Sequence, residues 1–219
     1  MAIRLIVFDL DGTLVDSRSD LAGAANELLQ ECGAAPLDDA AVGRMVGEGA
    51  AVLVRRAFDA AGLAEPADAL ARFLVRYSRR LLKTTRVYDG VPELLARLDG
   101  TASMTVLTNK PRDLARRLLD GLGLLDRFGE VFGGDAPYPR KPDPEGLRAL
   151  MAGAAADQAS TLVVGDSAID LRTARAAGVG ICLARYGFGY ETLPAGELRG
   201  DELFIDAPLD LLDRLHHAR

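Results

Sequence analysis

Two carboxylates lie close together directly after the first apolar segment of the chain. Residues 5–8 are an uninterrupted apolar run, and Asp9 and Asp11 follow it before Gly12. Such a run is typical of a strand that is buried on both faces of a parallel sheet. Neighbouring carboxylates repel each other unless a cation or a shared proton relieves the repulsion. The pair therefore indicates either a chemical site or, more simply, an aspartate-rich turn after an edge strand.

Other apolar runs also end in polar residues. Thr108 and Asn109 follow one such run, Asp166 follows another, and Lys141 lies in a proline-rich loop between them. Because the carboxyl ends of neighbouring parallel strands meet at one edge of a sheet, we expect these residues to share a crevice with the two acids. Carboxylates bind Mg²⁺, a hydroxyl and a lysine bind phosphoryl oxygens, and an aspartate can act as a nucleophile. The set therefore favours phosphoryl transfer, in which positioning and charge stabilisation do most of the work.

The elements that must position these residues alternate between strand and helix after about residue 87. Strands are predicted at 104–107, 131–132, 161–164, 181–184 and 203–205, with a helix between most of them and a last helix at 209–215. This alternation predicts an α/β protein with a doubly wound parallel sheet, that is, a Rossmann-like core.

Residues 17–86 have a different pattern, because only helical periodicity is found there. The clearest spacing is that of Phe73, Leu74, Tyr77 and Leu81. Four amphipathic helices with no strand between them are predicted, with Asp38 as one N-cap. We therefore expect an inserted helical cap domain at 17–86 and a catalytic core made of 1–16 and 87–219.

Composition limits the possible partners and the cellular setting. The formal net charge of −6 argues against a nucleic-acid partner, and no apolar run is long enough for a membrane span. Cys32 and Cys182 have no metal-ligand spacing, and the first residues do not resemble a signal peptide. We expect a cytoplasmic protein that acts on a small phosphorylated metabolite, without nucleic acid or membrane, as a monomer or a homodimer.

Four motifs, taken together, resemble those of the haloacid dehalogenase-like hydrolases, and the helical insertion looks like the type 1 cap of that superfamily. The motifs are Asp9-Leu10-Asp11-Gly12-Thr13-Leu14, Thr108-Asn109, Lys141-Pro142 and Gly165-Asp166-Ser167-Ala168-Ile169-Asp170. Within the superfamily the chain most resembles the phosphoglycolate phosphatases. That likeness is carried by Val46-Gly47-Glu48-Gly49, Thr108-Asn109-Lys110-Pro111, Ala176-Ala177-Gly178-Val179 and Tyr186-Gly187-Phe188-Gly189.

The resemblance implies a role for each core residue. Asp9 would attack phosphorus, and Asp11 would protonate the leaving oxygen and later activate the water that cleaves the aspartyl-phosphate. Thr108 and the backbone of Asn109 would hold the phosphoryl oxygens, while Lys141 offsets their charge. The crowded acidic setting is expected to favour the protonated form of Asp11, as a general acid requires.

A metal site is implied as well. Mg²⁺ would be bound by Asp9, by the backbone carbonyl of Asp11 and by Asp166. Asp170 lies one helical turn beyond Asp166, and it is expected to support the residues that bind Mg²⁺ rather than to be one of them.

The basic residues outside these motifs have simpler interpretations. Arg44, Arg55 or Arg56 in the cap could reach a substrate carboxylate, although a solvated helix face is the favoured interpretation. Lys110 is expected to cap its helix or to pair with a surface carboxylate.

The function that follows is a Mg²⁺-dependent phosphatase of small phosphomonoesters, with 2-phosphoglycolate as the leading substrate. A sugar-phosphate phosphomutase and a pyrophosphatase of the same superfamily are alternatives. A dehalogenase is disfavoured, because haloacid cleavage does not need the acid–base residue Asp11. A phosphoaspartate receiver domain, a signalling switch, uses a similar acidic pocket, but the chain length, the inserted helices and the Asp-x-Asp pair argue against it.

Overall fold

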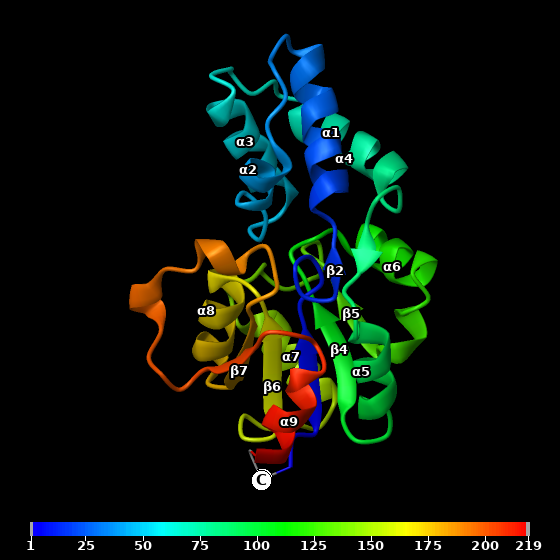
Figure 1. Cartoon of the computed structure of the whole chain (residues 1–219), viewed down its shortest axis with the longest axis vertical. Coiled ribbons are helices and arrows are strands. Elements are labelled where there is room, and N and C mark those ends of the chain that lie inside the picture. The colour runs from blue at the N-terminus through cyan, green and yellow to red at the C-terminus, as the bar shows by residue number, and fades with distance from the viewer. Residues whose placement is uncertain (1, 218–219) are drawn as a thin grey trace.

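A parallel sheet with helices on both faces forms most of the molecule, and four further helices lie together at one end (Figure 1). The computed structural model describes residues 2–217. Residue 1 and residues 218–219, the outer ends of the predicted core ranges, lie outside the described part. Within residues 2–217, no helix is both long enough and apolar enough to cross a membrane.

The sheet has β1 near its centre. Its strands are β1 (Leu5–Phe8), β4 (Ser103–Leu107), β5 (Glu130–Phe132), β6 (Thr161–Gly165), β7 (Gly180–Ala184) and β8 (Leu203–Ile205). They lie in the order β5-β4-β1-β6-β7-β8, and all neighbours are parallel. The chain builds one side of β1 and then crosses to the other, and ligands bind at the carboxyl ends of strands at such a switch point. The predicted doubly wound sheet is confirmed.

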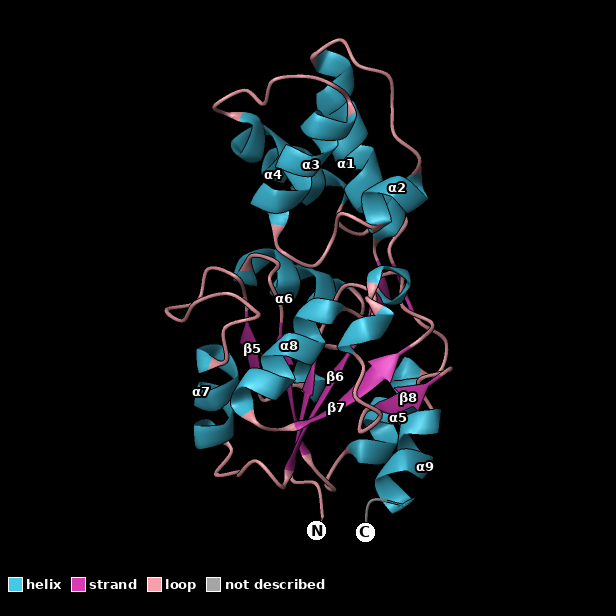
Figure 2. Ribbon diagram, turned by 90° about the vertical axis from the view of Figure 1, so that its left-hand side faces the viewer, coloured by secondary structure: helices cyan, strands magenta, loops and turns pink. Residues whose placement is uncertain are grey.

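Helices cover both faces of the sheet, which explains why β1 is apolar at every position. On one face lie α5 (Val91–Leu98), α6 (Arg112–Gly121) and α9 (Asp210–His217), and on the other lie α7 (Glu145–Gly153) and α8 (Ala168–Ala177). Ile6 and Phe8 pack on the first face, whereas Leu5 and Val7 pack on the second. Figure 2 shows α7 on the side of the strands opposite α5 and α9.

Four helices form the end layer, and we refer to them as the cap helices. They are α1 (Arg18–Glu31), α2 (Asp39–Gly43), α3 (Ala50–Ala60) and α4 (Ala69–Arg80). Asp38 accepts a hydrogen bond of 2.6 Å from the backbone N–H of Ala41, as expected of an N-cap. The predicted helices are observed, whereas the exact limits of a separate domain at 17–86 stay a prediction.

A short two-stranded ribbon joins the cap helices to the sheet. It pairs β2 (Val15–Asp16) with β3 (Arg86–Val87) in antiparallel fashion, so the chain enters and leaves the cap helices side by side. The carboxylate of Asp20 in α1 accepts hydrogen bonds of 2.8 Å from the N–H groups of Thr84 and Thr85. These contacts fix the start of α1 against the segment that leads back to the core.

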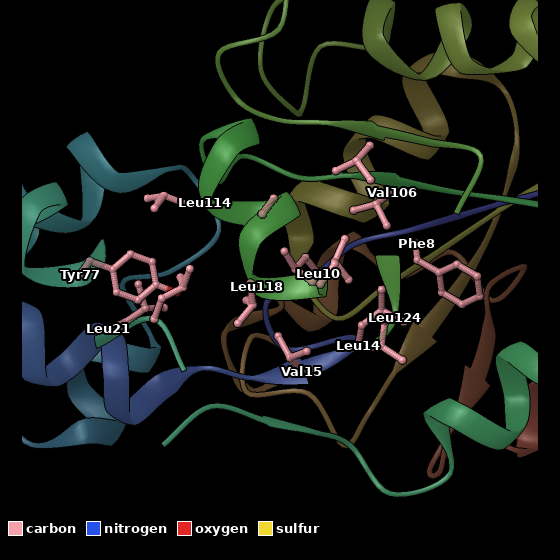
Figure 3. Packing of buried hydrophobic residues seen from close by; sticks show 14 of the residues in the cluster. Phe8, Leu10, Leu14, Val15, Leu21, Tyr77, Val106, Leu114, Leu118 and Leu124 are labelled. Atoms are coloured by element: carbon pink, nitrogen blue, oxygen red, sulfur yellow. The ribbon is translucent and has the colours of Figure 1, made fainter. Parts of the chain in front are cut away.

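The apolar core continues from the sheet into the cap helices. Figure 3 shows Leu10 and Leu118 packed between the sheet and the region where Leu21, Tyr77 and Leu114 meet. The cap helices are therefore packed onto the core, which places Tyr77 of α4 above the carboxyl ends of the strands.

Candidate active site

Three buried carboxylates meet at the carboxyl ends of β1 and β6. Asp9 directly follows β1, Asp166 directly follows β6, and Asp170 lies in the first turn of α8. One carboxylate oxygen from each lies within 4.8 Å of the others. Hard oxygen donors in this arrangement are those that Mg²⁺ prefers.

The electrostatics of these acids also fit a cation. Burial raises the pKa of Asp9 to about 7, with Lys141 opposing the shift and Asp170 adding to it. Burial raises the pKa of Asp166 well above its usual range, and the negative charges of Asp170 and Asp9 raise it further. A divalent ion would relieve both the burial cost and the mutual repulsion. The residues present therefore fit the predicted Mg²⁺.

Lys141 lies between two of these acids. Its Nζ is 2.8 Å from Oδ1 of Asp9 and 2.7 Å from Oδ1 of Asp170. Burial alone would lower the pKa of Lys141, but Asp170 and Asp9 outweigh it and raise the pKa. The other oxygen of Asp170 accepts a 2.6 Å hydrogen bond from the hydroxyl of Ser167. Asp170 thus contacts both Lys141 and Ser167, and its carboxylate also faces the other two acids. Its supporting role stays a prediction.

Asp166 is held by backbone groups that approach it very closely. The N–H of Gly189 donates a hydrogen bond of 2.7 Å to its Oδ2. Gly12 has a φ of +91°, and a Cβ at that position would lie 1.9 Å from the same oxygen. Only glycine fits there. The sequence predicts Gly12 as part of a tight turn, but gives no sign that Gly189 binds the carboxylate.

Thr108 and Asn109 lie at the carboxyl end of β4, as predicted. The hydroxyl of Thr108 is buried and accepts a 3.2 Å hydrogen bond from the N–H of Lys110. The side-chain amide of Asn109 donates to the carbonyls of Gly47, at 2.8 Å, and Lys141, at 2.9 Å. Asn109 therefore connects the core to the loop between α2 and α3. The roles of Thr108 and of the Asn109 backbone in phosphoryl binding stay predictions.

Lys110 is where the structure corrects the sequence-based expectation. It is only 6% exposed, and its Nζ lies 2.7 and 2.9 Å from the two carboxylate oxygens of Asp11. The same ammonium donates a 2.5 Å hydrogen bond to the hydroxyl of Tyr77 in α4. The expectation that Lys110 caps its helix or pairs with a surface carboxylate is wrong.

This ion pair also changes the description of Asp11. Its Oδ1 accepts a further 2.6 Å hydrogen bond from the hydroxyl of Ser17. The sequence-based description of Asp11 considered only the neighbouring acids and left out this ion pair with Lys110. One signal in the sequence could have pointed to Lys110: the chain has only three lysines among its 26 basic residues. Two of them, Lys110 and Lys141, are buried beside the strand ends.

A cavity lies between these polar groups and the cap helices. Its core side is lined by Asp9, Asp11, Thr108, Asn109 and Lys110. Its cap side is lined mainly by apolar groups, namely those of Leu21, Val46, Ala50, Leu53, Phe73, Leu74 and Tyr77. A small phosphate ester fits this division, with its phosphoryl group at the core and its leaving group toward the cap helices.

The three cap arginines do not belong to the set of described residues that line this cavity. Arg44 and Arg55 are exposed. Arg56 forms an ion pair with Glu48 and donates a 3.3 Å hydrogen bond to the carbonyl of Met45. Their predicted contact with a substrate carboxylate stays a prediction.

Comparison with known proteins shows the family of the chain. Residues 6–184 match the model of the haloacid dehalogenase-like hydrolases, and the chain belongs to that family. It is 48% identical over 214 residues to the phosphoglycolate phosphatase of Rhodospirillum rubrum, which covers 93% of this chain and 87% of that protein. It is 39% identical over 217 residues to the phosphoglycolate phosphatase of Cereibacter sphaeroides strain ATCC 17029, which covers 96% of this chain and 98% of that protein.

A solved structure gives the same result for the fold. The crystal structure described as "a predicted phosphoglycolate phosphatase" from Haemophilus somnus 129PT superposes with a TM-score of 0.88 at 31% identity, covering 97% of both chains. The chain is accordingly a phosphatase, a phosphoric monoester hydrolase that acts on a small phosphorylated molecule and resembles the phosphoglycolate phosphatases.

Proposed function

We propose that the protein hydrolyses 2-phosphoglycolate in a Mg²⁺-dependent reaction, through an aspartyl-phosphate on Asp9. One observation carries the chemistry: Asp9 is buried at the end of the central strand, 2.8 Å from Lys141 and beside two further carboxylates. The assignment of 2-phosphoglycolate as the substrate is supported by the names of the relatives at 48% and 39% identity.

In the first half-reaction, a carboxylate oxygen of Asp9 attacks phosphorus and the bond from phosphorus to the glycolate oxygen breaks. Asp11 gives its proton to that oxygen. The hydroxyl of Thr108 and the backbone N–H of Asn109 bind the phosphoryl oxygens, and Lys141 offsets their charge. To reach the leaving oxygen, Asp11 must exchange its present contacts for contacts with the substrate.

In the second half-reaction, Asp11 takes a proton from a water molecule, and the water oxygen attacks the phosphorus of the aspartyl-phosphate. The bond between phosphorus and Asp9 breaks, inorganic phosphate leaves and the carboxylate of Asp9 is restored. Asp9, the carbonyl of Asp11 and Asp166 would hold Mg²⁺, with Asp170 close by. When bound, the ion supplies positive charge to the phosphoryl oxygens and to the crowded acids.

The alternative functions differ from this proposal in the fate of the phosphoryl group. A phosphomutase would return it to a sugar phosphate, a pyrophosphatase would need pyrophosphate, and a receiver domain would keep its phosphoaspartate. The enclosing cap helices and the second acid, Asp11, favour turnover over storage. The cytoplasmic setting and the state of monomer or homodimer remain part of the same proposal.

Release of phosphate from a panel of small phosphomonoesters, sugar phosphates and pyrophosphate, each assayed with Mg²⁺, tests the proposal. We expect 2-phosphoglycolate to have the highest kcat/KM. Isomerisation of a sugar phosphate without phosphate release, or a higher kcat/KM for pyrophosphate, would overturn it.

A further inference from the structure

Lys110 is a buried cation that the proposed reaction does not use. Its ammonium contacts Asp11 at 2.7 and 2.9 Å and Tyr77 at 2.5 Å, and both partners line the cavity with it. Lys141, by contrast, contacts Asp9 and Asp170. The two lysines therefore lie beside different acids, one beside the proposed nucleophile and the other beside the proposed proton donor.

This placement puts Lys110 near the leaving group. In the proposed reaction Asp11 serves the oxygen that departs from phosphorus, so a group in direct contact with Asp11 lies close to the alcohol part of the ester. In 2-phosphoglycolate the carboxylate carbon is separated from that oxygen by a single methylene carbon. A cation in contact with the proton donor therefore lies on the side of the site where such a carboxylate would be.

The hydrogen bonds of Asp11 lead to the same conclusion. Its Oδ1 accepts from Ser17 and Lys110, and its Oδ2 accepts from Lys110. When Asp11 turns to the leaving oxygen, Lys110 keeps only the hydroxyl of Tyr77 among these partners. A buried ammonium without an anionic partner is costly, and the remaining cap side of the cavity is mainly apolar. The substrate must therefore bring the acceptor.

We propose that Lys110 and the hydroxyl of Tyr77 bind the carboxylate of the substrate's leaving group. The ammonium donates to one carboxylate oxygen, the Tyr77 hydroxyl donates to the carboxylate as well, and the apolar cap side covers the methylene group. The substrate class is then a small phosphomonoester that carries a carboxylate next to the ester carbon. This assignment rests on the proposed function for the chemistry at Asp9 and Asp11.

The test compares 2-phosphoglycolate with its carboxamide analogue, which is neutral at the position of the carboxylate. We expect the parent protein to prefer the carboxylate by about 10- to 100-fold in kcat/KM, as for one charge-assisted contact. The Lys110→Met variant should lose most of this preference. Lys83→Met removes a charge from an exposed lysine and serves as the matched control, with the preference unchanged.

Tyr77→Phe keeps the ring that stacks on Phe73 and removes only the hydroxyl, so it tests the site even if Lys110→Met does not fold. We expect it to reduce the preference by about 3- to 10-fold. An equal loss for both esters in Lys110→Met would mean that Lys110 only positions Asp11, which would overturn the proposal. If the parent hydrolyses both esters equally, this inference alone fails, whereas hydrolysis of neither ester defeats the proposed function itself.

Discussion

Lys141 and Asp9 form a buried ion pair, with 2.8 Å between Nζ and Oδ1. The lysine has a second partner, Asp170, at 2.7 Å, so it is not left alone when one acid is removed. Breaking a buried ion pair is usually destabilising because an uncompensated charge remains. The double pairing of Lys141 makes it possible to remove the nucleophile without that penalty.

Asp9→Asn is therefore expected to abolish phosphate release while the protein stays folded. The amide is a far poorer nucleophile than the carboxylate, and we expect kcat to fall by more than about 1,000-fold. Circular dichroism and the midpoint of urea unfolding should stay close to those of the parent. A variant that retains kcat within about tenfold of the parent would contradict the nucleophilic role.

Asp11→Asn should behave differently, because the nucleophile remains while the proton donor and base are lost. With a nitrophenyl phosphate, whose leaving group needs little protonation, the first step can proceed while hydrolysis of the aspartyl-phosphate is slow. We expect a phosphoenzyme that intact-protein mass spectrometry detects after rapid quenching. Normal steady-state turnover of 2-phosphoglycolate by this variant would rule out Asp11 as the acid–base residue.

Removal of divalent metal is expected to abolish activity, and added Mg²⁺ should restore it. A second readout does not depend on catalysis. An ion that binds the folded state but not the unfolded state raises the free energy of unfolding, by about 2.7 kcal/mol when its concentration is 100 times its Kd. Mg²⁺ should therefore raise the Tm of the parent but not that of Asp166→Asn. Asp59→Asn, which changes an exposed acid of α3, is the control and should respond as the parent does. Full activity after chelation would refute the metal site.

Asp20 should link the stability of the protein to pH. Burial alone would raise its pKa, but hydrogen bonds from Thr84 and Thr85 outweigh it and lower the pKa below the ordinary value of 3.8. A lowered pKa means that the ionised form of Asp20 stabilises the fold. This stabilisation is complete at pH values above the ordinary pKa of 3.8, and it is lost as the pH falls through the lower pKa of the folded state. Asp20→Asn should cost about 1–3 kcal/mol of unfolding free energy at neutral pH.

Urea unfolding of the parent and of Asp20→Asn at a series of pH values measures this linkage. The difference in unfolding free energy should be constant above about pH 5 and shrink under more acidic conditions. A difference that grows as the pH falls would contradict the assignment, because it would require a raised pKa in the folded state.

The parts of the fold with a strong local signal could be predicted from the sequence. The four residues of β1 are apolar because both faces of the sheet are covered, and the same holds for most positions of β4 and β6. Asp9 and Asp166 directly follow such strands, so the topology alone brings them together. The helical periodicity of α4 likewise placed Tyr77 on a buried face.

The remaining features depend on contacts between distant residues that leave no periodic pattern. Lys110 contacts Asp11 across 99 positions of the chain and Tyr77 across 33. Each of β2 and β3 has only two residues, too few for an alternation to be recognised. Gly189 is a turn residue by composition, and its hydrogen bond to Asp166 exists only because the loop folds back over β6.

The last prediction distinguishes the two sets of residues proposed to bind the substrate carboxylate. The sequence-based hypothesis names Arg44, Arg55 or Arg56, whereas the structure-based proposal names Lys110 with Tyr77. Because Arg44 and Arg55 are exposed and Arg56 pairs with Glu48, we expect Arg44→Ala, Arg55→Ala and Arg56→Ala to change little.

The measurement is the ratio of kcat/KM for 2-phosphoglycolate to that for nitrophenyl phosphate. It should stay within about twofold of the parent in all three arginine variants, since an exposed ion pair contributes little. If this ratio falls by about tenfold or more in one variant, as expected for the loss of a charge-assisted contact, that arginine and not Lys110 binds the substrate carboxylate. Such a result would also require the cap helices to move relative to the core during turnover, because none of the three arginines lines the cavity among the described residues.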